Sequence, residues 1–200
     1  MEIKQFSTSL ANSYLLVEGE TALLIDPVVK LDKLADYKIS HCFATHGHAD
    51  HIAEAKKITD HFQIPLYLHK DETIFIKDDT YNLSPYILGD SLEPVENLRL
   101  LTDQEKIDFQ GHLLETIHTP GHTKGSVMYL LDNKHLFSGD TLFKESIGRT
   151  DLKGGNQGLM ADTLTRLLSF DQDWLVYPGH GESTTFKEVK KVLRYWRRLI

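Results

Sequence analysis

Three histidines and one aspartate fall within six positions of the chain, at His46, His48, Asp50 and His51. Imidazole nitrogens and carboxylate oxygens are the ligands that Zn²⁺ and similar divalent ions prefer in proteins. The alternative explanation is a surface turn with solvated histidines, on which Asp50 caps a helix. Because four potential ligands in six residues are a poor fit to chance, the pattern favours a metal site.

The residues on either side predict that this cluster lies on a turn from a strand to a helix. Residues 39–44 are short and largely apolar, as in a buried strand, and apolar residues then recur at helical spacing over 52–63. In the extended part, His46 and His48 point the same way, and the glycine between them is expected to let the backbone turn tightly. The next two ligands open the helix, so that one turn could supply two neighbouring metals.

Three more potential ligands, His122, Asp140 and His180, each follow an apolar strand and sit beside a glycine. Loops at strand ends can bring distant residues to one point while the strands stay packed. Any one of the three alone would more often be structural or exposed. Together with the first cluster they suggest two sites. The assignment is His46, His48 and His122 for one ion, Asp50, His51 and His180 for the other, and Asp140 as a bridge.

Composition limits the class of protein. The chain has 200 residues, with 40% hydrophobic residues, 26% charged residues and a net charge of −7, which suits a globular protein without nucleic-acid or membrane partners. Cys42 is the single cysteine, so no disulfide can form within the chain, as in a reducing cytoplasm. No signal pattern and no apolar run of about 20 residues is present, and we expect a cytoplasmic protein.

Strand and helix patterns alternate along the chain, which predicts an α/β protein with helices packed on sheets. We expect one domain over residues 1–200 with two similarly ordered halves, about 1–110 and 111–200. In the first half, the expected strands are 13–17, 21–25, 39–44 and an edge strand at 64–69, and the expected helices are 31–37, 52–63 and 71–76. In the second half, the expected strands are 113–118, 127–131, 135–138 and 175–177, with helices at 159–168 and from about 187.

The motifs Thr-His-Gly-His-Ala-Asp-His, Pro-Gly-His-Thr-Lys-Gly-Ser, Ser-Gly-Asp-Thr-Leu-Phe and Pro-Gly-His-Gly resemble the metallo-β-lactamase superfamily. The stretch Ser-Ile-Gly-Arg-Thr-Asp at 146–151 looks more narrowly like its glyoxalase II-related, hydroxyacylglutathione hydrolase-like branch. The resemblance implies a four-layer αββα sandwich with the metals at one edge. It also implies the two-site ligand assignment given above.

Three departures from the family pattern bear on function. Asp140 replaces the cysteine of the commonest zinc β-lactamase subclass, which argues against antibiotic hydrolysis. Val28 replaces a usual glycine, a change expected to be tolerated. Twenty residues follow His180, so the C-terminal helical domain that contacts glutathione in glyoxalase II is expected to be absent. Glutathione recognition therefore stays open, as does a role for the basic last helix.

The expected chemistry is hydrolysis of a small thioester or ester by a hydroxide that bridges two divalent metal ions, zinc first, with iron or manganese as alternatives. Asp50 is the candidate residue to orient the hydroxide and accept its proton. Rival interpretations are a sulfur dioxygenase with one iron held by His46, His122 and Asp140, and a non-catalytic metal-binding protein. The loop at 144–158 is a candidate lid, and Arg149 is expected to pair with Asp151.

Overall fold

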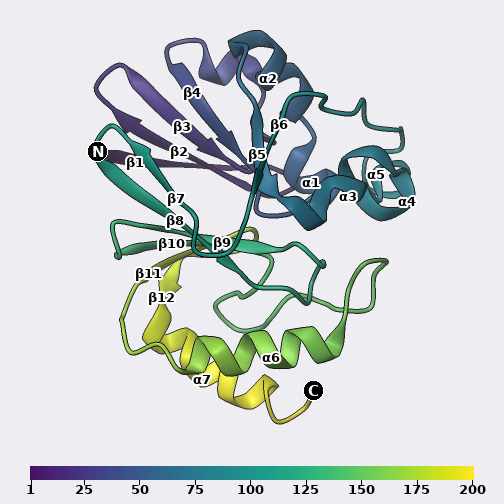
Figure 1. Ribbon diagram of the computed structural model, residues 1–200, viewed down its shortest axis with the longest axis vertical. Helices are drawn as coiled ribbons and strands as arrows, with labels where there is room; N and C mark the ends of the chain where they lie inside the picture. The colour runs from purple at the N-terminus through teal and green to yellow at the C-terminus, as the bar shows by residue number, and fades with distance from the viewer. The chain divides into compact units, whose positions relative to one another are not determined.

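The computed structural model describes residues Met1–Ile200, which form two compact units, Met1–Leu101 and Thr102–Ile200. Each unit is one six-stranded sheet with helices packed on it (Figure 1). The observed division comes earlier than the expected one near residue 110, and the expectation of a single domain over 1–200 stays a prediction. No helix of either unit is long and apolar enough to span a membrane.

The first unit has a sheet whose strands lie in chain order. Its strands are β1 (Glu2–Ser7), β2 (Asn12–Glu18), β3 (Thr21–Ile25), β4 (Lys38–Phe43), β5 (Leu66–His69) and β6 (Leu98–Leu101). Its helices are η1 (Leu31–Leu34), α1 (Ala49–Ile52), α2 (Ala55–Phe62), η2 (Lys70–Glu72), α3 (Thr73–Lys77), α4 (Asp79–Asn82) and α5 (Ser84–Ile87). Strands β1 to β3 pair antiparallel and β3 to β6 pair parallel, so β1, β3 and β4 end at the same edge of the sheet.

Apolar side chains from the sheet and from α2 form the core of the first unit. Leu24 and Cys42 of the sheet belong to one buried cluster with Ala55 and Ile58 of α2. Burial raises the pKa of the Cys42 thiol well above its ordinary value, so Cys42 behaves as a small apolar residue of this core. The expected helix at 52–63 is divided between α1 and α2, because the backbone N–H of Glu54 donates to Pro27 at 2.9 Å instead.

Several predictions for the first unit were wrong in detail. The expected helix at 31–37 is a single 3₁₀ turn, and the expected edge strand at 64–69 is an interior strand paired on both sides. The short helices α4 and α5 and the strands β1 and β6 were not predicted. Core packing is observed for Phe75, whereas Tyr86 is 91% exposed.

The second unit has a sheet with the strand order β12-β11-β10-β9-β8-β7. Its strands are β7 (Lys106–Phe109), β8 (His112–His118), β9 (Val127–Leu131), β10 (His135–Gly139), β11 (Leu175–Pro178) and β12 (Thr184–Thr185), and its helices are α6 (Gln157–Leu168) and α7 (Phe186–Trp196). Strands β8 and β10 both pair antiparallel with β9, and β11 pairs parallel with β10. The carboxyl ends of β8, β10 and β11 therefore meet at one edge. The strands and helices expected here are confirmed, whereas β7 and β12 were not predicted.

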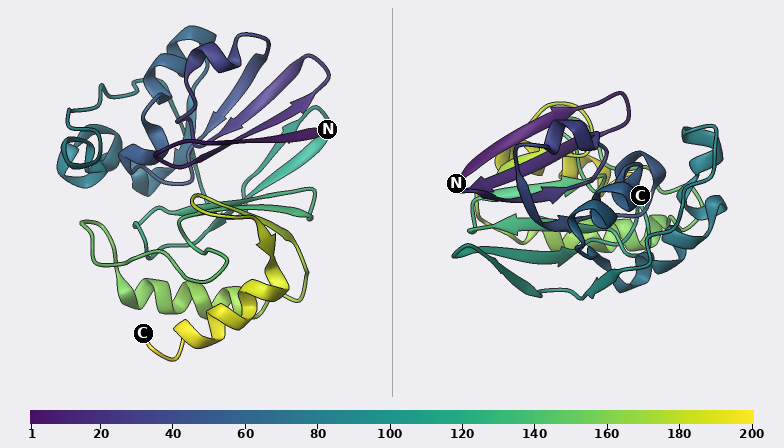
Figure 2. Two further views of the ribbon diagram at one scale, coloured as in Figure 1. Left: turned by 180° about the vertical axis from the view of Figure 1, so that it is seen from behind. Right: turned by 90° about the horizontal axis from the view of Figure 1, so that it is seen from above.

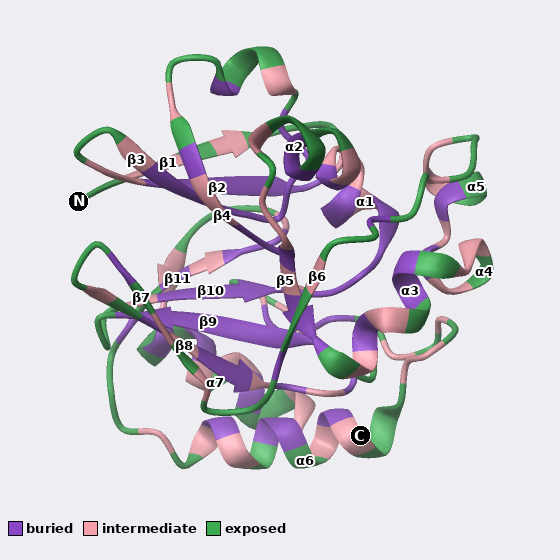
Figure 3. Cartoon of the chain, turned by 45° about the horizontal axis from the view of Figure 1, so that its top comes forward, coloured by how far each residue is buried: buried purple, intermediate pink, exposed green.

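Helices α6 and α7 lie side by side on the second sheet (Figures 1 and 2). Met160 and Leu164 of α6 and Val189 and Leu193 of α7 are buried in one cluster with residues of β9, β10 and β11. Burial also runs along β9 and β10 (Figure 3). The last helix thus docks through its apolar face, whereas Leu199 lies beyond its end and is exposed.

Candidate functional site

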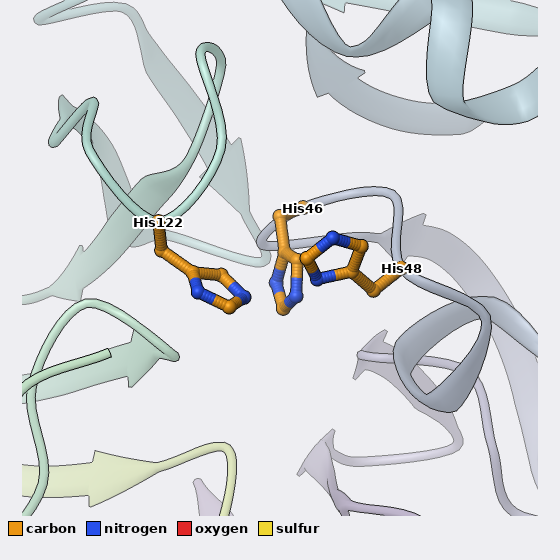
Figure 4. Close-up of side chains that lie close together, drawn as sticks. All are labelled: His46, His48 and His122. Atoms are coloured by element: carbon orange, nitrogen blue, oxygen red, sulfur yellow. The ribbon is translucent and has the colours of Figure 1, made fainter. Parts of the chain in front are cut away.

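The first potential ligands lie where β4 ends and α1 begins. His46, His48 and His51 are each at most 3% exposed, so the alternative of solvated histidines is wrong. The ring centroids of His46 and His48 are 4.9 Å apart, and those of His46 and His51 are 4.2 Å apart. Figure 4 shows the first two projecting from the loop before α1. Asp50 is partly exposed and lies in the first turn of α1, while the N-cap position belongs to His48, so the expected capping by Asp50 is not observed.

Asp26 orients two of these histidines. Its carboxylate is buried and accepts the Nδ1–H of His51 at 2.9 Å and the hydroxyl of Thr45 at 3.0 Å. Because the Thr45 hydroxyl already donates its proton to Asp26, its oxygen acts as the acceptor for the Nδ1–H of His46 at 3.1 Å. Both imidazoles thus carry the proton on Nδ1, which leaves the lone pair of Nε2 available to a metal ion. The sequence pattern did not mark Asp26 as a functional residue.

Residues from η2 and α3 also contact the loop that carries the histidines. The buried carboxylate of Glu72 accepts the backbone N–H of Gly47 at 2.7 Å. A side chain at Gly47 would bring a Cβ within 2.4 Å of the Cβ of Phe75. The φ of Gly47 is not positive, so this glycine serves close packing against α3 and not the tight turn that the sequence suggested.

In the second unit, His122, Asp140 and His180 meet at the carboxyl edge of β8, β10 and β11. Oδ2 of Asp140 lies 3.7 Å from Nε2 of His122 and 3.4 Å from Nε2 of His180. The Nδ1–H of His122 donates to the carbonyl oxygen of Arg149 at 2.8 Å, so its Nε2 keeps a lone pair. Figure 4 shows His122 on the loop after β8. The sequence prediction that these three residues follow strands and come together is confirmed within this unit.

The loop after β10 packs directly on these ligands. A Cβ added to Gly148 would lie 1.8 Å from the carbonyl oxygen of Asp140 and 3.2 Å from the Cβ of His122, so only glycine fits. Next to it, Arg149 forms a bidentate pair with Asp151 at 2.7 and 2.8 Å, as expected. Hydrogen bonding from the guanidinium lowers the pKa of Asp151 to about 2.

The donor set of each unit fits a divalent transition-metal ion. Neutral imidazoles with a lone pair on Nε2, together with carboxylate oxygens, are the usual ligands of zinc and of non-haem iron. In the first unit the donors are three buried histidines and one partly exposed carboxylate. In the second unit two imidazole nitrogens face one carboxylate oxygen at distances too long for good hydrogen bonds. This histidine-rich arrangement could hold metal ions.

A family model described as the Metallo-beta-lactamase superfamily matches residues 8–180. The chain belongs to the metallo-β-lactamase superfamily. The resemblance noted from the motifs is therefore confirmed, and the matched residues include all seven potential ligands described above.

Two relatives of the superfamily cover most of this chain. The chain is 34% identical to "Probable metallo-hydrolase YqgX" of Bacillus subtilis, over 87% of this chain and 86% of that protein. It is 27% identical to "Hydroxyacylglutathione hydrolase GloC" of Haemophilus influenzae, over 87% of this chain and 86% of that protein. The chain thus spans most of the length of both relatives.

Two solved structures share the fold. One is described as BLEG-1 B3 metallo-beta-lactamase, with a TM-score of 0.87 and 30% identity over 98% of this chain and 99% of that chain. The other is TTHA1623 in a di-iron-bound form, with a TM-score of 0.77 and 29% identity over 94% of this chain and 96% of that chain. The predicted αββα fold of the metallo-β-lactamase type is confirmed by these likenesses.

Proposed function

We propose that this chain is a metal-dependent hydrolase that uses two divalent metal ions to cleave a small thioester or ester. The observation that carries the proposal is the tautomer of His46, His51 and His122. In each of them Nδ1–H donates a hydrogen bond, so that Nε2 carries the lone pair that can bind a metal ion. Membership of the superfamily and the metallo-hydrolase named among the relatives support the same class of reaction.

The ligand assignment follows the motifs of the family. One ion would be held by His46, His48 and His122, the other by Asp50, His51 and His180, with Asp140 shared by both. When bound, such ions supply Lewis acidity and lower the pKa of a water ligand towards about 7.

The residues of the chain then position the reacting groups. Asp50 is partly exposed at the start of α1, where its carboxylate can accept a proton from the attacking water. His180 is the most exposed of the proposed ligands, at 38% of its side chain, so the substrate would approach from its side. A thiolate is a good leaving group, and cleavage of a thioester needs no strong general acid.

The substrate and the metal are chosen on chemistry and on similarity. Similarity to the relative named a hydroxyacylglutathione hydrolase supports a thioester. Zinc is our first choice of metal, while the di-iron form of a structural neighbour makes iron the second. If iron is the bound metal, one rival function must also be tested. This is a sulfur dioxygenase with a single iron held by His46, His122 and Asp140. The neighbour described as a B3 metallo-beta-lactamase adds a β-lactam to the substrates to test.

The first experiment is to count the metal ions per chain in freshly purified protein by elemental mass spectrometry. Two ions per chain, together with hydrolysis of thioesters, would support the proposal. One iron per chain with oxygen consumption on a persulfide would support the dioxygenase instead. If no metal is retained after zinc, iron and manganese have been offered, both enzymatic functions are wrong.

Substitution of Asp50 tests its role in turnover. Asp50→Asn should lower kcat for a thioester by about 10²- to 10⁴-fold, because the amide cannot accept the proton. Asp36→Asn, a change at an exposed aspartate of the same unit, is the matched control and should leave kcat unchanged. Equal kcat values for the two variants would remove Asp50 from the mechanism.

A further inference from the structure

The first unit contains a cavity of about 560 Å³ that the proposed chemistry does not use. It is lined by the end of β1, the turn at 8–10, residues 28–30, Lys33, and Ala53 and Glu54 between α1 and α2. Pockets for small organic ligands measure roughly 300–1,000 Å³, so the cavity is large enough for one.

This cavity lies at the edge of the sheet that carries the histidines. Strands β1, β3 and β4 run in the same direction, and the cavity is built on residues that follow β1 and β3, while His46 follows β4. Two hydrogen bonds from backbone N–H groups hold its walls in place. The N–H of Glu54 donates to Pro27 at 2.9 Å, and the N–H of Val28 donates to Ser13 Oγ at 3.1 Å. A ligand in the cavity would therefore lie on the functional side of the first unit.

The walls of the cavity are mainly apolar. Phe6, Leu10, Val28, Val29 and Ala53 contribute hydrocarbon surface. Two of the three hydroxyls among the lining residues already have partners in the chain, because Ser7 donates to Asn12 at 2.8 Å and Thr8 accepts the N–H groups of Leu10 and Ala11. The interior is thus suited to a hydrocarbon chain or an aromatic ring and not to a sugar or another polyol.

Positive charge at the rim of the cavity restricts the class of ligand further. Lys30 and Lys33 are exposed lining residues, and neither takes part in an ion pair. The acidic lining residue, Glu54, is paired with Lys57 at 3.1 Å. An apolar cavity beside two lysines whose charge is not neutralised matches a ligand with a hydrocarbon body and an anionic end.

We propose that this cavity binds an arm of the substrate that consists of an aliphatic or aromatic chain and ends in a carboxylate. The identification of the ligand with substrate rests on the proposed thioesterase function, whereas binding by itself does not. The carboxylate can belong to the acyl part or to the thiol part of the thioester. In either case Lys30 and Lys33 discriminate it from a neutral chain of the same length.

Binding is tested first, without turnover, by calorimetric titration of the full chain with octanoate and with octanamide. Octanoate should bind about fivefold more tightly than the amide, and Lys30→Gln/Lys33→Gln should abolish the difference. Lys38→Gln, at the opposite end of β4, is the matched control and should change nothing. Ala53→Trp fills the cavity and should weaken octanoate binding at least tenfold. If octanoate does not bind, or binds equally to all variants, the proposal is wrong.

Turnover then tests the link to substrate. Two thioesters of equal chain length are compared, one ending in a methyl group and one in a carboxylate, with the carboxylate placed on the acyl part in one series and on the thiol part in another. In one series the carboxylate should raise kcat/KM about fivefold, and the double lysine variant should remove the gain. If the methyl-ended and the carboxylate-ended thioester have equal kcat/KM values in both series, the proposal is wrong while the thioesterase function stands. If no thioester is cleaved, the proposed function is wrong. Whether the cavity binds a ligand with an anionic end is then decided by the octanoate titration alone.

Discussion

Replacement of Asp26 by asparagine tests whether this carboxylate controls metal binding through the histidine tautomers. The backbone of Asp26 has a φ of 55°, a left-handed conformation that asparagine also tolerates, so the substitution adds no backbone strain. Asparagine also keeps the volume of the side chain. What changes is the ability of one atom to accept a hydrogen bond.

The geometry decides which atom of the amide takes which place. Oδ1 of Asp26 accepts the backbone N–H of Thr45 at 2.7 Å, and that N–H cannot turn away. The amide oxygen must therefore stay there, and the NH₂ group occupies the position of Oδ2, facing Nδ1 of His51 at 2.9 Å. A donor now faces this nitrogen, so the proton of His51 moves to Nε2 and the ring can no longer bind a metal through that atom.

The expected magnitude follows from the partners lost. Loss of a residue that orients a metal-binding histidine typically costs 10- to 100-fold in metal affinity, or about 1.4–2.7 kcal/mol. In the metal-free protein, a buried hydrogen bond to a charged carboxylate is replaced by a weaker one to a neutral amide, which should lower its free energy of unfolding by about 1 kcal/mol. Two separate quantities therefore change.

The assay measures both quantities. Zinc affinity is determined by competition with a chromogenic chelator, and stability by urea unfolding of the metal-free protein. Ser13→Ala is the matched control. It removes a hydroxyl that accepts the N–H groups of Val28 and Val29 and donates to the backbone carbonyl oxygen of Asp26, and it should cost about 1–2 kcal/mol in stability, but it keeps the carboxylate group of Asp26. A zinc affinity of Asp26→Asn within twofold of the parent would refute the reasoning.

Three further predictions concern other parts of the chain. Gly148→Ala should lower activity and metal content at least tenfold while circular dichroism stays native, because a Cβ would collide with Asp140; unchanged metal content would contradict this packing. Burial lowers the pKa of His41, so the unfolded chain takes up a proton more readily as the pH falls through about 6.5. Stability should therefore decrease from pH 7.5 to 5.5, and His41→Gln should reduce that slope in urea unfolding. Cys42 should resist thiol reagents at pH 8 until urea is added, and rapid labelling of the native protein would show that the thiol is accessible.

Much of the fold could be predicted because its signals are local. Apolar runs bounded by glycine, proline and aspartate marked β3, β4, β8, β9 and β10, and helical spacing marked α6 and α7. Strands with weak patterns were missed or misplaced. The edge strand β1 is mostly exposed, and β5 became an interior strand only because β6 pairs with it across about thirty residues of chain. Such pairing depends on the partner strand, which a local pattern does not contain.

The sequence by itself determined which residues carry the chemistry of this protein. Ligand type and spacing on the turn at 46–51, and the position of His122, Asp140 and His180 after strands, are properties of neighbouring residues. Only the tertiary structure showed how these side chains are oriented. Asp26 reaches Thr45 and His51 from 19 and 25 residues away, and Glu72 reaches Gly47 from 25 residues away. Buried carboxylates find such partners through the packing of separate strands and helices, and so the control of the histidines became visible only in the folded chain.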